Sequence, residues 1–227
     1  MNYAVILSGG VGTRLGLEMP KQYYKVNNKM ILQYVTETIS NCDFIQGYVI
    51  VAAEAWQDTI RESLGDTKFL GFALPGENRQ LSIYHGLLAL QDVAGEGDVV
   101  LIQDAARPNT TEALMKSCLF FDESMDGTMP VLKMKDTVYL SHDGKQVNSL
   151  LNRDEIYAGQ APEAFLYGKY LRANQALLPD EILKINGSTE PAIKAGMKIA
   201  LIDGDENNYK VTTLDDLERF KSVQERN

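Results

Sequence analysis

Cysteine is scarce in this chain of 227 residues, which contains only Cys42 and Cys118. The two lie far apart and neither belongs to a Cys-x-x-Cys pair, so we expect neither a structural zinc site nor a disulfide framework. Such cysteine usage favours the cytoplasm. The first residues, MNYAVILSGG, read directly into a strand without a basic leader or a cleavage site, so we expect no export signal.

The chain also lacks excess positive charge and long apolar runs. Its formal net charge is −9 at pH 7, which argues against a nucleic-acid partner or an anionic membrane surface. No stretch of about 18 apolar residues is present, so nothing predicts a membrane span. A small anionic ligand remains compatible, because it needs only a few basic side chains in one cleft. His85 and His142 lack the spacing of metal ligands, and we expect both to be structural or exposed.

Short apolar runs alternate with helical stretches along the chain. We expect strands at 3–7, 48–53, 99–103, 129–133 and 198–202, and helices at about 30–40, 80–91, 111–121 and 214–223. Continuous apolar strands separated by helices predict an α/β fold, with a mainly parallel twisted sheet covered by helices on both faces. Ligands bind such sheets beyond the carboxyl ends of the strands. No linker or repeat interrupts the pattern, so we interpret residues 1–227 as one domain.

One segment, about 136–156, breaks this alternation. TVYLS and QVNSLL are typical of two strands, and Asp143-Gly144 between them is a favoured hairpin turn. A hairpin inserted late in an α/β domain could be a surface decoration, a lid or a dimerisation arm. Two exposed strands are not stable alone, so we expect the arm to pair with a second subunit.

The most distinctive local pattern is the glycine-rich segment 8–16, SGGVGTRLG, followed by MPKQ at 19–22. Its glycines allow a tight turn whose backbone N–H groups face an anion. Gly-Lys-Ser/Thr is absent, which excludes a Walker A loop, and the glycine spacing misses the dinucleotide fingerprint. Arg14 and Lys21 add a fork of donors and a point charge suited to a phosphate chain. The alternative is a plain strand-to-helix turn with exposed basic residues.

Three further motifs narrow the choice of ligand: GENRQLS at 76–82, DAARP at 104–108 and NYKVTT at 208–213. The opening GGxGTRxG with PKQ is similar to that of nucleotidyltransferases acting on sugars and sugar alcohols. The whole set, in this order and across nearly the whole chain, resembles the family of 2-C-methyl-D-erythritol 4-phosphate and ribitol-5-phosphate cytidylyltransferases. The resemblance implies a Rossmann-like nucleotidyltransferase fold, CTP and an alditol phosphate as substrates, Mg²⁺ as cofactor and a homodimer.

The resemblance also implies roles for individual residues. Those expected to act on the transferring phosphoryl group are Arg14, Lys21 and Lys210. Those expected to bind CTP are Leu7, Ser8, Gly9, Gly10, Gly12, Thr13, Gly76, Arg79, Ser82, Asp104 and Ala105, with Gly76 and Ser82 reading cytosine, Arg79 supporting their loop and Asp104 binding Mg²⁺. Those expected on the acceptor side are Arg107, Thr137, Asn186 and Arg153, the last reaching the site of the neighbouring subunit.

Several of these residues have simpler interpretations. Asp104 could form only an ion pair with Arg107, and Ser82 could cap the helix that begins near Gln80. Arg79 and Arg153 could be exposed surface charges, and Lys210 a solvated strand residue. A lone carboxylate at the end of an apolar strand is nevertheless costly unless it is paired or binds a metal.

The chain departs from the resembled family at three places. The position three residues before Lys210 is Asn207 rather than an acidic residue, which removes one candidate metal ligand. Ala161 precedes Pro162 where the family carries threonine, and counting back from Lys210 places Asn186-Gly187 where it carries Thr-Asp. The last two changes fall on the acceptor side, so we expect an alditol phosphate for capsule or wall polymers rather than 2-C-methyl-D-erythritol 4-phosphate.

Two other functions compete with this prediction. A nucleotide-sugar pyrophosphorylase using UTP or dTTP explains the glycine-rich loop but not GENRQLS or NYKVT. A nucleotide-binding relic without activity would be expected to lose the charged set, yet Arg14, Lys21, Asp104 and Lys210 are all present. The sequence therefore predicts a CTP-dependent cytidylyltransferase.

Overall fold

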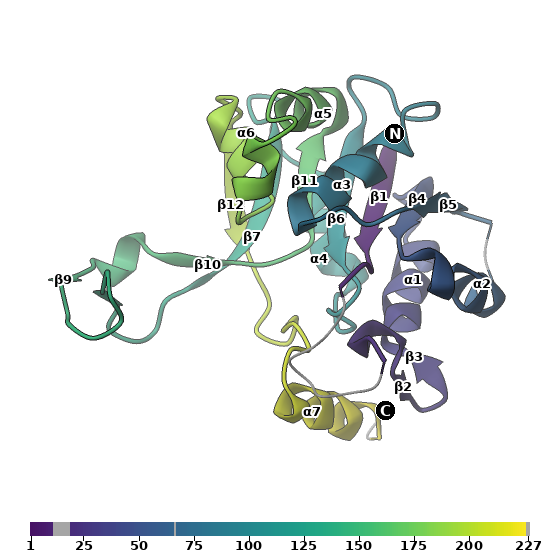
Figure 1. Ribbon diagram of the computed structural model, residues 1–227, viewed down its shortest axis with the longest axis horizontal. Coiled ribbons are helices and arrows are strands. Elements are labelled where there is room, and N and C mark those ends of the chain that lie inside the picture. Colours follow the sequence, from purple (N-terminus) through teal and green to yellow (C-terminus); the bar gives the residue numbers. More distant parts are fainter. Residues whose placement is uncertain (11–18, 66, 226–227) are drawn as a thin grey trace.

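A single twisted sheet organises the computed structural model, which describes residues 1–10, 19–65 and 67–225 (Figure 1). Its eight strands follow the order β10-β7-β11-β6-β1-β4-β5, and β12 also pairs with β7. The strands are β1 (Asn2–Leu7), β4 (Gly47–Val51), β5 (Phe69–Ala73), β6 (Val99–Asp104), β7 (Gly127–Lys133), β10 (Tyr157–Gly159), β11 (Glu163–Leu166) and β12 (Ile199–Asp203).

Most of these strands run in one direction. β1 is parallel to β4 and β6, β4 to β5, and β12 to β7. β11 is antiparallel to both β6 and β7, which therefore share a direction, and β10 is antiparallel to β7. The five predicted strands are all present and mutually parallel. β5, β10 and β11 were not predicted from the sequence.

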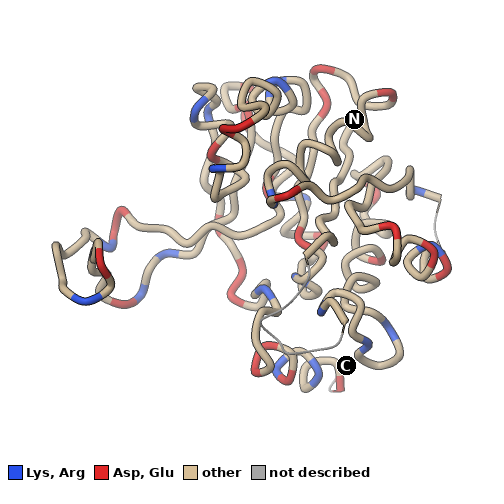
Figure 2. Tube along the Cα trace, viewed as in Figure 1, with Lys and Arg blue, Asp and Glu red and all other residues tan. Residues whose placement is uncertain are grey.

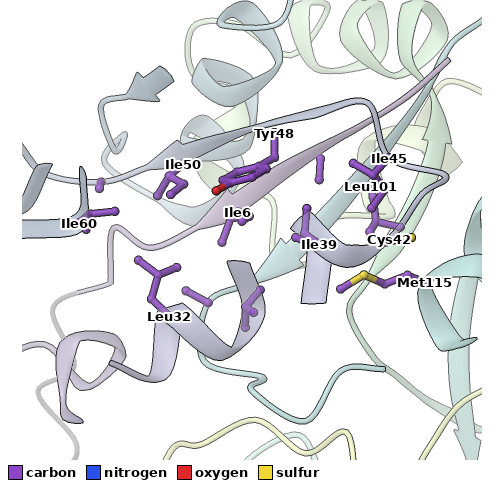
Figure 3. Close-up of a cluster of buried hydrophobic side chains, with 14 of the residues drawn as sticks. Ile6, Leu32, Ile39, Cys42, Ile45, Tyr48, Ile50, Ile60, Leu101 and Met115 are labelled. Atoms are coloured by element: carbon purple, nitrogen blue, oxygen red, sulfur yellow. The ribbon is translucent and has the colours of Figure 1, made fainter. Parts of the chain in front are cut away.

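Helices cover both faces of the sheet. On one face lie α1 (Ile31–Asn41), α2 (Glu54–Ser63) and α4 (Glu112–Leu119), and on the other lie α3 (Arg79–Leu88), α5 (Tyr167–Gln175) and α6 (Glu190–Lys194). Successive residues of β1 alternate between the two cores, as a strand's twofold period requires: Ala4 and Ile6 face α1, whereas Tyr3 and Val5 face α3 and α5. Figure 3 shows the first core, in which Ile6, Tyr48 and Ile50 of the sheet meet Leu32 and Ile39 of α1.

A smaller cluster attaches the end of the chain to the region that follows the glycine-rich segment. α7 (Leu214–Gln224) packs Leu217 and Phe220 against Val26 and Ile31, close to the short hairpin of β2 (Lys25–Val26) and β3 (Lys29–Met30). Val211 belongs to the same cluster. The segment that carries Lys210 is thereby anchored from its C-terminal side.

The predicted hairpin projects away from the sheet between β7 and β10 (Figure 1). Its paired strands, β8 (Tyr139–Leu140) and β9 (Ser149–Leu150), are shorter than expected, and the loop between them runs over 141–148 instead of a two-residue turn. Asp143 closes that loop because its carboxylate accepts hydrogen bonds from the backbone N–H groups of Lys145 and Gln146. Gly144 adopts a positive φ of 67° there. We call residues 134–156 the arm.

The helices among the described residues are too short and too polar for any of them to cross a membrane.

Candidate active site

A cavity of about 600 Å³ opens at the carboxyl ends of β1 and β6. Its walls come from the turn after β1, the loop after β5, the end of β6 and the segment before α7. The residues that line it are Leu7, Gly9, Gly10, Lys21, Gln22, Pro75, Gly76, Glu77, Asn78, Arg79, Ser82, Asp104, Ala105, Ala106, Lys210 and Thr212. Most of the residues predicted to bind CTP therefore meet in one place, as expected for parallel strands that end at one edge.

The turn after β1 is held by side chains of the Pro-Lys-Gln motif and its neighbour. The Nε2 of Gln22, which is 4% exposed, donates to the carbonyl oxygens of Ser8 (2.7 Å) and Gly10 (2.8 Å), and the Tyr23 hydroxyl donates to Ser8 (2.9 Å). Ser8 lies buried behind the cavity wall, with its N–H bonded to Val51. Gln22 was not predicted as a site residue, although its position directly after Lys21 in the motif could have indicated it.

Close backbone approach explains one glycine of this turn. A Cβ on Gly9 would lie 2.6 Å from the Cβ of Pro75, so the turn and the loop after β5 can touch only because residue 9 has no side chain. Lys21 follows Pro20 at the start of a short 3-10 helix, Lys21–Tyr23, and lines the cavity. Gly12, Thr13 and Arg14 lie outside the described residues.

The loop after β5 takes its shape from Asn78 and Ser82. Asn78 is the N-cap of α3, since its Oδ1 accepts from the N–H of Leu81 (2.8 Å). The Oγ of Ser82 accepts from the N–H of Gly76 (2.9 Å) and donates to the carbonyl of Asn78 (2.8 Å). The alternative in which Ser82 caps this helix is therefore wrong. Ser82 instead closes the 76–82 loop on itself, and a Cβ on Gly76 would collide with Leu81.

Three cations surround the Asp104 carboxylate among the described residues. Its oxygens lie 3.1 Å from Nη2 of Arg79, 3.0 Å from Nζ of Lys210 and 3.5 Å from Nε of Arg107. Burial alone would raise the pKa of this carboxyl, but the charges of Arg79, Lys210 and Arg107 outweigh burial and hold the pKa well below its usual range. Asp104 thus does form the ion pair with Arg107 that the simpler interpretation expected, together with two more.

The segment that carries Lys210 is not a strand, contrary to the simpler interpretation of that lysine. Residues 204–212 form a turn-rich connection between β12 and α7. Arg107, half-buried, lies behind Asp104 and donates from Nη1 to the carbonyl of Asn208 (2.6 Å). Arg107 is not among the described residues that line the cavity, and its bond to Asn208 holds the backbone of this segment.

A second buried carboxylate, Glu163 at the start of β11, was missed by the sequence analysis. It is 7% exposed and accepts hydrogen bonds from the hydroxyls of Ser188 and Thr189, the second at 2.9 Å. In the described part of the chain it makes no ion pair. Burial raises its pKa, and the nearby charge of Arg79 offsets only part of that effect. Its position directly after Ala161-Pro162, within an apolar segment, was the available signal.

The structure does not bring the other acceptor-side residues to this cavity. Thr137 and Arg153 are exposed on the arm, where Arg153 donates from Nη1 to the carbonyl of Lys135 (3.0 Å). Arg153 lines a separate cavity of about 460 Å³ with Lys133, Lys135 and Tyr157.

Asn186 is also remote from the cavity. It is exposed, and within the described part of the chain its hydrogen bonds are to nearby residues: its N–H donates to the Glu190 carboxylate and its Nδ2 to the carbonyl of Lys184. The hydroxyls in this segment belong instead to Ser188 and Thr189, which are buried. Asn186 carries an amide where the resembled family carries threonine, and the nearest hydroxyls stand two and three residues further along the chain.

The described residues contain no group of three or more His, Cys, Asp or Glu side chains placed to share a metal ion. Asp104 is the carboxylate that faces the cavity from the end of β6. Asp205, beside Asn207, accepts from the backbone N–H of Asn207 and so is turned to its own loop. A protein-only metal cage is therefore not formed by these residues.

Comparison with known proteins places this geometry in a family. Residues 2–225 match the family IspD, described as 2-C-methyl-D-erythritol 4-phosphate cytidylyltransferase. The chain belongs to the IspD family. The resemblance inferred from the motifs is thus confirmed, and with it the nucleotidyltransferase class.

Two kinds of cytidylyltransferase are found among the relatives of this chain. The chain is 32% identical to 2-C-methyl-D-erythritol 4-phosphate cytidylyltransferase of Petrotoga mobilis, over 100% of both chains. It is 29% identical to ribitol-5-phosphate cytidylyltransferase of Streptococcus agalactiae serotype Ia, over 98% of this chain and 95% of the relative. The sequence identities to these two relatives, which are named for different acceptor substrates, are therefore similar.

Solved structures of the IspD family share the fold. The 4-diphosphocytidyl-2C-methyl-D-erythritol synthase of Anaerococcus prevotii superposes with a TM-score of 0.84 at 23% identity, covering 99% of this chain and 96% of that one. The IspD of Francisella tularensis gives 0.77 at 25% identity, with coverage of 97% and 98%. The predicted α/β fold with a mainly parallel sheet and helices on both faces is confirmed.

Proposed function

We propose that this chain transfers the CMP part of CTP to a small alditol phosphate and releases pyrophosphate. The observation that carries the proposal is the placement of Lys21, Lys210 and Asp104 on the wall of one cavity, together with the closed 76–82 loop. The IspD family membership supports the same reaction, since the relatives are named cytidylyltransferases of such phosphates.

The reaction needs positioning and positive charge rather than a covalent intermediate. An oxygen of the acceptor phosphate forms a bond to the α-phosphorus of CTP while the bond from that phosphorus to the pyrophosphate oxygen breaks. Two anions must approach each other, so Lys21 and Lys210, with Arg14 from the glycine-rich segment, stabilise the charge that develops. The lysine ammonium groups donate to phosphate oxygens and hold the reacting groups in line.

Cytosine fits the loop after β5. The Ser82 hydroxyl bonds to the Gly76 N–H and the Asn78 carbonyl inside the loop, so other backbone groups of 76–78 would read the base, held in place by these bonds and by Asn78. A rigid loop that donates and accepts at fixed points leaves groups unpaired with uracil. CTP is therefore the proposed nucleotide, and a UTP-using pyrophosphorylase is the alternative.

Mg²⁺ is the proposed cofactor, with Asp104 as its protein ligand. Mg²⁺ commonly binds through one or two carboxylates and completes its shell with substrate phosphates and water, so the Asp104 carboxylate at the end of β6 fits it. When bound, the ion would neutralise phosphate charge. Asp104 would hold the ion, and Arg79 and Lys210, which contact the two Asp104 oxygens, would supply positive charge beside the phosphates.

The arm is proposed to make the protein a homodimer. It exposes Tyr139, Val147 and Leu150, which are 58%, 67% and 64% accessible in one chain, and charged positions of both signs follow its trace (Figure 2). A two-stranded hairpin with such apolar residues is not stable alone and favours pairing with a second copy. Arg153 at the arm root would then complete the acceptor site of the neighbouring subunit.

The acceptor is proposed to be an alditol phosphate for capsule or wall polymers, such as a glycerol or ribitol phosphate. The observation behind this choice is Ala161, which presents no hydroxyl where the resembled family has threonine. 2-C-methyl-D-erythritol 4-phosphate is the second candidate, and the relative from Petrotoga mobilis favours it.

Cys42 and Cys118 are buried and unpaired, which supports a reducing, cytoplasmic location.

Pyrophosphate release tests the reaction directly. The purified chain is incubated with Mg²⁺, each of the common nucleoside triphosphates and each acceptor separately, and kcat/KM is compared. We expect CTP to be preferred over UTP and purine triphosphates by a large factor. Comparable values for UTP and CTP would refute the nucleotide assignment, and a clear preference for the methylerythritol substrate would move the acceptor assignment to isoprenoid synthesis.

Light scattering at micromolar concentration tests the assembly. A dimer is expected, and deletion of the arm tip, residues 141–148, should leave the sheet intact but weaken dimerisation and activity together. A fully active monomer would contradict the proposed role of Arg153.

A further inference from the structure

Gln160 joins the arm to the segment that carries Lys210. It directly follows β10, the strand by which the chain returns from the arm, and it is 6% exposed. Its Nε2 donates to the carbonyl of Asp205 (2.9 Å), and its Oε1 accepts from the N–H of the same residue (3.0 Å). The Gln160 amide therefore bonds to both the N–H and the carbonyl of Asp205, as the backbone of a neighbouring strand would.

The fit around this side chain is tight. A Cβ on Gly204 would lie 2.4 Å from Oε1 of Gln160, so the amide lies directly against the backbone of the segment. β7 holds both partners, because the N–H of Gln160 donates to Pro130 and the N–H of Gly204 donates to Val131. Gln160 and Gly204 are thus held side by side on β7, and the Gln160 amide joins the return strand to Asp205.

The same contact chain continues to the lysine. Asn208, fully buried, donates from Nδ2 to the carbonyl of Ala161 (2.7 Å), and its own carbonyl lies 3.4 Å from Nε2 of Gln160. On the other side of Lys210, the N–H of Val211 donates to Ala106 (2.8 Å). The backbone is thereby fixed on both sides of Lys210, whose Nζ lies 3.0 Å from Asp104.

A lysine side chain does not fix its own end. Its four-carbon stem is flexible, so the position of Nζ depends on where the backbone is held. A displacement of about 1 Å at a reacting group can cost on the order of 10²-fold in rate. The exposed ion pair of Lys135 with Glu206 also joins the arm to this segment, but such surface pairs contribute little.

We propose that Gln160 is a positioning residue for Lys210, through which the return strand of the arm sets the distance between that lysine and Asp104. The kinetic part of this proposal rests on the proposed function. The structural part does not, because the contact between Lys210 and Asp104 can be observed in the ligand-free protein.

The test replaces Gln160 with Glu, which keeps the shape but puts an oxygen where Nε2 faced the carbonyls of Asp205 and Asn208. Gln33→Glu is the matched control, because the Gln33 amide likewise accepts from a backbone N–H, of Met30 (2.7 Å), and donates to a carbonyl, of Ser63 (3.3 Å), away from the site. Gln160→Met removes both bonds without adding a charge and replaces Gln160→Glu if that variant does not fold.

The first readout is the NMR signal of ¹³C-methylated lysines in the full-length, ligand-free protein, with Lys210 assigned by its loss in Lys210→Arg. We expect the Lys210 signal in Gln160→Glu or Gln160→Met to move toward that of Lys145 on the exposed arm loop, and to stay in place in Gln33→Glu. An unmoved signal in a folded Gln160 variant overturns the proposal, as does an equal movement in the control.

The second readout separates kcat from KM. We expect kcat of the Gln160 variants to fall about tenfold or more while KM for CTP changes less than about twofold, because the 76–82 loop is untouched. A rise in KM alone would contradict the positioning role. Absence of pyrophosphate release by the unmodified protein would refute the proposed function instead, and the NMR result would still decide the inference about Gln160.

Discussion

Two buried carboxylates lie at the same edge of the sheet, and their pKa values are shifted in opposite directions. Asp104 ends β6 and Glu163 begins the adjacent antiparallel strand β11, where Glu163 pairs with Ile102. Both are less than 8% exposed. The pKa of Asp104 is held low by three cations, whereas the pKa of Glu163 is raised by burial because hydroxyl groups, rather than cations, contact it.

Because both carboxylates are buried, burial does not explain the difference. The neighbouring charged or hydroxyl groups decide whether the ionised form of each carboxylate is stabilised. Arg79 interacts with both carboxylates but in different ways. It forms an ion pair with Asp104, whereas its charge acts on the pKa of Glu163 without an ion pair. A carboxylate that stays ionised suits cations and phosphates in a cavity, while one that resists ionisation suits a structural hydrogen bond to Ser188 and Thr189.

The largest expected effect comes from removing a cation on the Asp104 side. Lys210→Ala should lower kcat by roughly 10²-fold or more, since the lysine would stabilise charge that grows in the transition state. The midpoint of urea unfolding should change little. Lys169→Ala is the control, because Lys169 pairs with Asp126 in a half-exposed bridge outside the cavity. A folded Lys210→Ala protein with normal turnover would show that the pair is only structural.

Removing the anion should be the next largest effect. Asp104→Asn leaves Arg79, Lys210 and Arg107 facing one another, so we expect the free energy of unfolding at pH 7 to fall by about 2 kcal/mol. The low pKa means that this stability is present above the unfolded-state pKa of about 3.9 and is lost as pH falls toward the lower folded pKa. Urea unfolding at pH 7 and pH 3 measures both points, and a loss that persists undiminished at pH 3 would contradict the charge argument.

The opposite sign is expected at the second carboxylate. Ser188 and Thr189 donate to different oxygens of Glu163, so Glu163→Gln keeps the acceptor for one of them and replaces the other oxygen with an NH2 group. The variant also removes a carboxyl whose ionisation burial disfavours, so stability at pH 7 should stay equal or rise by about 1 kcal/mol. Because the folded pKa of Glu163 is raised, the wild-type side chain is least costly below the unfolded-state pKa of about 4.3, and its cost grows as pH rises. The gain in the variant should therefore vanish near pH 4. A variant less stable than wild type at pH 7 would reverse the comparison.

A third carboxylate, held by backbone and hydroxyl donors, should give the smallest effect. Asp216 accepts from Thr212 and from the N–H of Thr213, and although partial burial raises its pKa, these bonds lower it to about 2. Asp216→Asn weakens the capping box of α7 by about 0.5–1 kcal/mol. The loss should be seen in thermal unfolding at pH 7 and should shrink as pH falls from about 3.9 toward 2. No loss at pH 7 would mean that solvent replaces these bonds.

The amino-acid sequence alone determined the parallel centre of the sheet. β1, β4 and β6 were predicted because a strand buried on both faces needs a continuous apolar run, which is visible without the fold. β7 and β12 were predicted from the same kind of run, although β12 is only partly buried. β11 was missed because it is short and begins with a charged residue, and β5 because Gly71 and intermediate burial weaken its pattern. The motifs also indicated the cavity walls, because their glycines and cations follow strand ends, where ligands bind in such a sheet.

Tertiary structure alone decided which polar groups meet. Glu163 and Ser188 are 25 residues apart, Arg79 and Asp104 are also 25 apart, and Gln160 and Asp205 are 45 apart, so no local pattern records their contacts. The same holds for the two carboxylates. Their side chains are chemically alike in the sequence, and the ionisation of each is set by the distance to Arg79, Lys210 and Arg107, which exists only once β6, α3 and the segment before α7 have packed together.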